Sequence, residues 1–168
     1  MKPTLVLGTR KGFIAYHFLN GHWQMENLSF EGIPVSIAYA DPRSGDWWAC
    51  LDHGHWGVKL HRSRDRGVTW EEVVAPAYPE GAEITVGVPA ATRYIWAMAN
   101  GGKNYPSRMW LGTDPGGLFV SEDGGSSFQL VESLWQHPSR IESWAGGGRD
   151  QPGIHSIVVD PREENHIH

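Results

Sequence analysis

The sequence predicts an all-β protein made of short strands and tight turns. The chain has 168 residues, with 21 Gly and 11 Pro that favour turns and 9 Trp, 5 Tyr and 5 Phe that favour strands. Its apolar runs are short and bounded by Gly, Pro, Asp or Asn, and no window keeps a 3.6-residue apolar stripe long enough for a helix. We expect strands at residues 4–9, 12–18, 35–40, 47–51, 58–62, 70–74, 95–99, 109–112, 118–121, 128–131 and 155–159.

The chain also contains an internal repeat. Residues 63–70 and 121–128 both read Ser-x-Asp-x-Gly-x-(Ser/Thr)-aromatic, at a spacing of about 60 residues. Two further pairs match in the same frame: Asp-Pro-Arg at residues 41–43 and 160–162, and Gly-Thr at residues 8–9 and 112–113. Three matches in one frame indicate that a single structural unit is repeated along the chain.

Each repeat holds four expected strands, which is typical of a β-propeller blade. A stacked solenoid is the rival, but its repeats are usually shorter and carry a helix or a single strand. We expect the strands of a first blade at residues 4–30, a second blade at 35–74, a third at 95–131 and the start of a fourth at 155–168. About three blades make an incomplete ring, because propellers usually have four to eight. Residues 1–168 are therefore expected to be the N-terminal part of one β-propeller, or to self-associate if the chain is complete.

With these motifs the chain resembles the Asp-box (BNR) repeat propellers, the group that includes sialidases and sortilin-type domains. It is most similar to bacterial Asp-box proteins described as sialidase-like or glycosyl-hydrolase repeat proteins, and the resemblance runs from Thr4 to the last residue. In such a turn the aspartate accepts backbone N–H bonds, a glycine takes positive φ and the closing aromatic packs between blades. The residues expected to have this structural role are Ser63, Asp65, Gly67, Trp70, Ser121, Asp123, Gly125 and Phe128.

The loops of a propeller alternate between two faces, and we expect the site on the face opposite the Asp-boxes. Histidine, arginine and tryptophan gather in the loops of that face, including the long segment 133–153. Indole rings stack on sugar rings and guanidinium groups bind carboxylates, although tryptophans can also fill the gaps between blades. The ligand-binding candidates are Arg10, Lys11, Glu31, His53, His55, Trp56, Trp135, His137, Arg140, Trp144 and His155.

Four of these candidates could instead ligate a divalent metal. Neutral imidazoles suit zinc, copper or nickel, and His-x-His spacing on a strand places both rings on one side. The four are His53, His55, His137 and His155. The favoured interpretation is that they bond loop backbone or a ligand, so we predict no metal and no other cofactor.

Three functions fit these observations. We favour a propeller that binds a small molecule, a glycan or a partner without established catalysis. The first alternative is a sialidase-like glycoside hydrolase, with Arg10 or Arg140 holding an acidic sugar. The resemblance implies an Arg-Ile-Pro motif in the first blade, and residues 8–12 read Gly-Thr-Arg-Lys-Gly instead. The second alternative is a protein-interaction scaffold.

Composition excludes other classes of function and suggests a location. The 14 basic and 19 acidic residues give a net charge of −5, which argues against binding nucleic acid. No apolar run approaches the roughly 18 residues that a membrane span needs, so we predict no membrane association. The single cysteine, Cys50, lies in an apolar strand, where we expect it to be buried and inert, and it fits a cytoplasmic protein.

Overall fold

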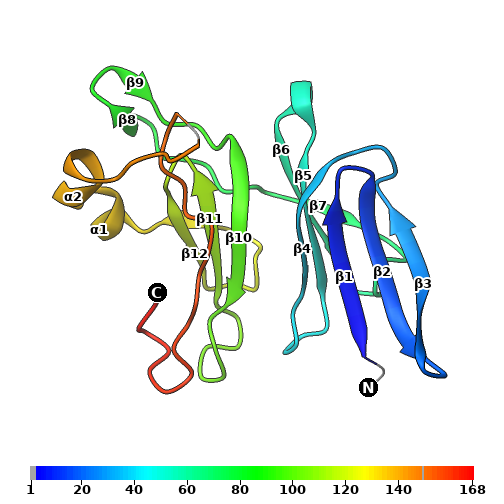
Figure 1. Ribbon diagram of the computed structural model, residues 1–168. Helices are drawn as coiled ribbons and strands as arrows, with labels where there is room; N and C mark the ends of the chain where they lie inside the picture. The colour runs from blue at the N-terminus through cyan, green and yellow to red at the C-terminus, as the bar shows by residue number, and fades with distance from the viewer. Residues whose placement is uncertain (1–2, 149) are drawn as a thin grey trace. The chain divides into compact units, whose positions relative to one another are not determined.

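The computed structural model describes residues 3–148 and 150–168, which form a protein of antiparallel sheets (Figure 1). The chain divides into two compact units, unit 1 up to Val73 and unit 2 from Val74. In unit 1 a three-stranded sheet contains β1 (Thr4–Thr9), β2 (Gly12–Leu19) and β3 (His22–Ser29). A four-stranded sheet comes next, with β4 (Val35–Ala40), β5 (Trp47–Asp52), β6 (Val58–Ser63) and β7 (Glu71–Val73). The 3-10 turn η1 (Gly54–Trp56) joins β5 to β6.

Unit 2 contains a second four-stranded sheet in sequential order. Its strands are β10 (Tyr94–Asn100), β11 (Met109–Asp114), β12 (Leu118–Ser121) and β13 (Gln129–Leu130). A small hairpin, β8 (Glu83–Thr85) and β9 (Val88–Pro89), precedes it, and two short helices, α1 (Glu132–Trp135) and α2 (Pro138–Glu142), come after it. Neither helix, nor any other among the described residues, is long and apolar enough to cross a membrane. The predicted all-β class and the antiparallel four-stranded units are confirmed.

Two local expectations are wrong. Residues 155–159 do not form a strand, because their only ladder contact in the described chain is an isolated bridge between Val159 and Ile167.

Part of the predicted long loop at residues 133–153 is helical instead. The helices have four and five residues, which is too short to show a 3.6-residue stripe. The N-terminus of α2 still has local signals, since Pro138 is its first residue and the Ser139 N–H donates to the His137 ring at 3.3 Å.

The core of unit 1 lies between its two sheets. Alternate residues of β5, including Trp47 and Leu51, face the β1–β3 sheet, and they pack with Phe13, which is fully buried. The closing aromatic of the first repeat, Trp70, completes this cluster, since its ring centroid lies 5.0 Å from that of Phe13. Its indole N–H donates to the Ser29 hydroxyl at 3.0 Å. Trp70 therefore ties the second sheet to the first.

The two repeated motifs form the same turn, which we call the aspartate turn. In the first, the Ser63 hydroxyl accepts the Gly67 N–H at 2.6 Å and donates to Asp65 at 2.8 Å. The Asp65 carboxylate also accepts the Thr69 N–H and hydroxyl, at 2.8 and 2.6 Å. Gly67 has φ of +84°, a conformation that favours glycine.

The second aspartate turn repeats these contacts atom for atom. The Ser121 hydroxyl accepts the Gly125 N–H at 2.8 Å and donates to Asp123 at 2.7 Å. The Asp123 carboxylate accepts the Ser127 N–H at 2.9 Å and the Ser127 hydroxyl at 2.6 Å. The sequence repeat is therefore also a repeat of structure.

These turns are expected to make stability depend on pH in the acid range. Hydrogen bonds, those from Thr69 first, lower the pKa of Asp65 to about 2, and those from Ser127 lower the pKa of Asp123 well below its usual range. A depressed folded-state pKa adds stability that is fully present above the unfolded pKa of about 4 and is lost as pH falls toward 2. We expect the urea midpoint to fall over that interval, and to fall less steeply in an Asp65→Asn/Asp123→Asn variant. An equal slope in the variant would contradict this account.

Candidate functional site

In unit 1 the loops that carry predicted site residues lie at one end of the sheets. They join β1 to β2, β3 to β4 and β5 to β6, and successive antiparallel strands bring such loops to the same end. The Gly32 N–H donates to the Lys11 carbonyl at 3.0 Å, and the Asp52 N–H donates to the Pro34 carbonyl at 2.9 Å. The aspartate turn of this unit joins β6 to β7 and therefore lies at the opposite end of the sheet. We call the first end the loop end of unit 1.

A hollow of about 390 Å³ opens at this end between the two sheets. We call it the unit 1 hollow. Its volume falls within the range of small-molecule sites. The lining residues are Phe30, Ile33, Leu51, His53, Trp56, Lys59, His61 and Glu72. Of the predicted site residues, it therefore brings His53 and Trp56 together.

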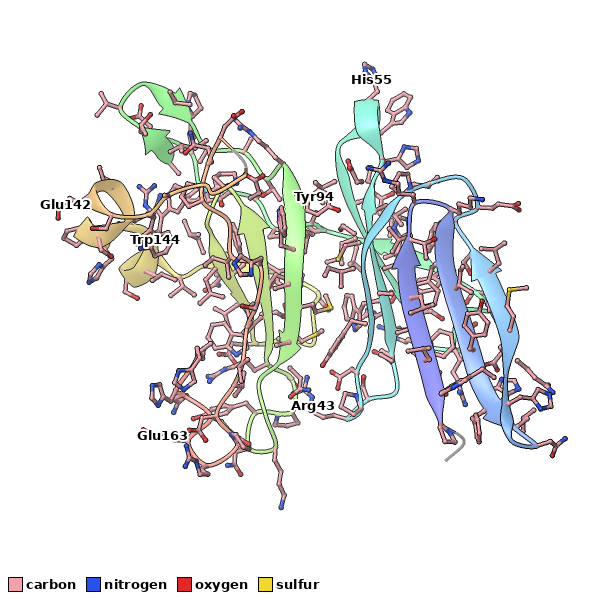
Figure 2. The ribbon with its side chains drawn as sticks, viewed as in Figure 1. Arg43, His55, Tyr94, Glu142, Trp144 and Glu163 are labelled. Atoms are coloured by element: carbon pink, nitrogen blue, oxygen red, sulfur yellow. The ribbon has the colours of Figure 1, made fainter. Side chains whose placement is uncertain are left out.

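The apolar wall of the hollow includes an exposed tryptophan. Trp56 ends η1, whose turn is closed by N–H bonds from Trp56 to the His53 carbonyl at 3.2 Å and from Gly57 to the Gly54 carbonyl at 3.1 Å. The Trp56 side chain is 70% exposed, and its ring packs edge-on against His55, with 5.4 Å between centroids. Figure 2 shows His55 at the tip of this loop. Trp56 is thus an exposed aromatic side chain that lines the hollow.

The polar wall comes from alternate residues of β6 and their neighbour on β7. Lys59 forms an ion pair with Glu72 at 2.7 Å, and the hydrogen bond from Lys59 is the main cause that lowers the pKa of the Glu72 carboxyl. His61 packs against Phe30, with 4.8 Å between ring centroids, and its Nδ1 is buried without a hydrogen-bond partner among the described residues. Burial is the first cause that lowers the pKa of His61, which favours the neutral form of the ring.

Sequence reasoning missed His61, Lys59 and Glu72. The alternation of β6 was the available signal, because residues two apart on a strand share a face. The predicted Arg10, Lys11 and Glu31 are exposed on neighbouring loops and do not line the hollow.

In unit 2, two predicted site residues take part in packing. The Arg140 guanidinium lies over the buried Trp135 ring at 3.8 Å, donates to the Ile84 carbonyl at 3.0 Å and also donates to the Trp135 carbonyl. Tyr78 also packs against Trp135, with 4.8 Å between ring centroids. These contacts hold α1 and α2 beside the β8–β9 hairpin.

The remaining predicted residues of unit 2 have different surroundings. His137 bonds Ser139 at the start of α2, at 2.8 Å between ring nitrogen and hydroxyl. Trp144, labelled in Figure 2, lines a pocket of about 80 Å³ together with Arg140, and His155 lines another of about 60 Å³ with Trp96. Both pockets are smaller than an ordinary ligand site.

The four histidines weighed as metal ligands are divided between the units, with His53 and His55 in unit 1 and His137 and His155 in unit 2. Within the described part of the chain, a group with metal-ligating spacing occurs elsewhere, at Asp160, His166 and His168. Sequence reasoning did not find this group.

Comparison with known proteins shows the fold and nothing finer. No protein-family model matches the chain, and no curated protein matches it. Among solved structures, it is similar to a GH74 xyloglucanase from Xanthomonas campestris, with a TM-score of 0.59 and 13% identity over 98% of this chain and 24% of that one. It is also similar to YCF48 bound to D1 peptide, with a TM-score of 0.44 and 16% identity over 74% of this chain and 34% of that one.

The chain therefore spans about a third or less of the length of these two structures. The xyloglucanase is a β-propeller, and its likeness extends over nearly the whole of this chain. With the sequential four-stranded sheets, this likeness identifies the fold as a set of propeller blades that make up part of a ring.

Proposed function

We propose that the chain is part of an Asp-box propeller that binds a neutral glycan in the unit 1 hollow and does not hydrolyse it. One observation carries the proposal. The exposed Trp56 indole and the His61 ring, whose buried Nδ1 has no hydrogen-bond partner among the described residues, line the same hollow. A buried polar atom without a partner is costly, so a ligand hydroxyl that reached Nδ1 would be stabilised by the hydrogen bond it supplied.

Assignment to the Asp-box propellers is supported by the two aspartate turns. Both use serine, aspartate and glycine in the same roles, and Trp70 closes the first turn by packing between two sheets. The proposed site lies at the end of unit 1 opposite the aspartate turn of that unit. We also propose that the protein is cytoplasmic, where the buried Cys50 would stay reduced.

The charges of the hollow favour a neutral sugar over an acidic one. Lys59 and Glu72 neutralise each other, and the described lining residues include no arginine. Sugar hydroxyls both donate and accept, which suits an ammonium, a carboxylate and imidazoles together. The apolar face of a pyranose ring would stack on Trp56.

The same groups support binding over hydrolysis. Most glycoside hydrolases use two carboxyl groups, and the general acid needs a raised pKa. Glu72 is the one carboxylate among the described lining residues, and its pKa is lowered. A sialidase-like site on Arg140 is disfavoured because that guanidinium already donates to two backbone carbonyls.

The test is calorimetric titration of the 168-residue chain with cellotetraose as the neutral probe and sialyllactose as the acidic one. We expect cellotetraose to bind with a Kd of about 0.1–1 mM, the range of a shallow site, and sialyllactose to bind more weakly. Trp56→Ala and His61→Ala should each weaken cellotetraose binding about tenfold, a loss of about 1.4 kcal/mol. Trp23→Ala is the matched control, because Trp23 is 47% exposed on β3 and does not line the hollow.

Two outcomes would contradict the proposal. Cellotetraose binding that survives Trp56→Ala and His61→Ala would place the site elsewhere. Preferential binding or cleavage of sialyllactose, lost in Arg10→Ala, would establish the sialidase-like alternative.

A further inference from the structure

The two Asp-Pro-Arg motifs form the same turn, although the residues after each turn differ. The Asp41 carboxylate accepts the Arg43 N–H at 2.8 Å and its guanidinium at 3.1 and 2.7 Å. Asp160 accepts the same groups of Arg162 at 2.8, 3.0 and 2.7 Å. Figure 2 marks the first turn by Arg43 and the second by Glu163. The aspartate–arginine pair is therefore common to both turns.

After the second turn the chain folds back and pairs with itself. The Val158 and His168 backbones exchange two hydrogen bonds of 2.8 Å, and the Asp160 N–H donates to the His166 carbonyl at 3.0 Å. Val159 and Ile167 form an antiparallel bridge between these bonds. Because side chains alternate along paired segments, Asp160, His166 and His168 lie on the same side of this hairpin.

The three side chains lie close together. One ligand atom from each lies within 4.8 Å of the other two, and the two imidazole centroids are 4.4 Å apart. The histidines are exposed and Asp160 is buried, so the group opens to solvent above a fixed carboxylate. At the first turn the Asp41 N–H donates to the Asp46 carbonyl in the same way. Asp46 therefore corresponds to His166, and Trp48, which pairs with Tyr39, corresponds to His168. The first turn thus has no histidine at either position.

We propose that Asp160, His166 and His168 form a binding site for a divalent transition-metal ion, with zinc, nickel or copper as the class. Two imidazoles and one carboxylate are a common ligand set for these ions, and a fourth position would remain for water. Calcium and magnesium prefer all-oxygen sites and fit this group poorly. A bound ion would link the two arms of the hairpin.

Arg162 is the group that opposes an ion at this site. Its guanidinium donates to both oxygens of Asp160, and its positive charge repels a cation. Oδ2 of Asp160 accepts one hydrogen bond and retains a lone pair for a metal. Removing the charge of Arg162 should therefore strengthen metal binding.

The test is zinc titration of the 168-residue chain in competition with a chromophoric chelator, with cobalt absorption as a second readout of coordination. We expect one site per chain, weakened about tenfold or more by His166→Ala and by His168→Ala, and strengthened several-fold by Arg162→Gln. His22→Ala removes another exposed histidine, on β3, and should leave the affinity unchanged. Excess calcium should not displace zinc.

The same variants distinguish binding at this site from adventitious binding to other histidines. Zinc affinity that persists in the His166→Ala/His168→Ala variant would overturn the proposal, as would a loss of affinity in Arg162→Gln. Both histidines are exposed, so thermal melting of the metal-free variants should match that of the parent chain.

Discussion

Replacing Phe13 with alanine is expected to lower the free energy of unfolding of unit 1 by about 3–5 kcal/mol. The Phe13 side chain is fully buried between the two sheets. Its ring centroid lies 5.7 Å from that of Trp47 and 5.0 Å from that of Trp70. The substitution removes apolar area and leaves a cavity that the flanking indoles, each held in a different strand or turn, cannot fill. Urea unfolding followed by tryptophan fluorescence measures the loss.

Phe18 supplies the matched control for this substitution. It lies on the same strand, β2, but is 39% exposed and packs edge-on against the exposed Trp23. Phe18→Ala should cost about 1 kcal/mol or less. If the two variants were equally destabilised, the core of unit 1 would not lie where Phe13, Trp47 and Trp70 place it.

The features that could be predicted from the sequence are those encoded locally. Strand positions follow from apolar runs bounded by turn residues, and the aspartate turns follow from a pattern in which each residue has a defined hydrogen-bonding role. The grouping of the residue 10–11 and 53–57 loops at one end of unit 1 follows from strand order alone. These features need no knowledge of which side chains meet.

The features that could not be predicted depend on contacts between distant segments. Arg140 and Trp135 are residue types that often line ligand sites. In the structure they stack on each other, and Arg140 also donates a hydrogen bond to the Ile84 carbonyl. Strand alternation places His61 on one face with Lys59, but the hollow on that face is formed by packing with Phe30 and Ile33 from another loop. The Asp160 group requires the pairing of Val158 with His168, for which the short His-x-His pattern gives no signal.

The Gly-Thr repeat leads to the second large prediction. Gly8 lies on the edge strand β1 and Gly112 on the second strand of its sheet, β11, and each allows a neighbouring backbone to pass closely. A Cβ on Gly8 would lie 2.8 Å from the Val35 carbonyl of β4. A Cβ on Gly112 would collide with the Ile154 carbonyl. The N–H of Ile154 donates to the Thr113 carbonyl at 3.0 Å. The segment around Ile154 therefore runs beside β11 as β4 runs beside β1.

Gly112→Ala and Gly8→Ala are each expected to lower the free energy of unfolding by about 1–3 kcal/mol, because the group in the way is backbone and cannot rotate aside. Gly112→Ala should also speed amide exchange at Ile154, since its hydrogen bond to Thr113 is the contact displaced. Gly153→Ala is the control, because its Cβ would meet nothing closer than 3.5 Å. A Gly112→Ala protein as stable as Gly153→Ala, with an equally protected Ile154 amide, would mean that the segment does not pack on β11. The repeated structural unit would then end with the aspartate turn at Asp123, and the segment from Ile154 to His168 would not be the start of a further unit.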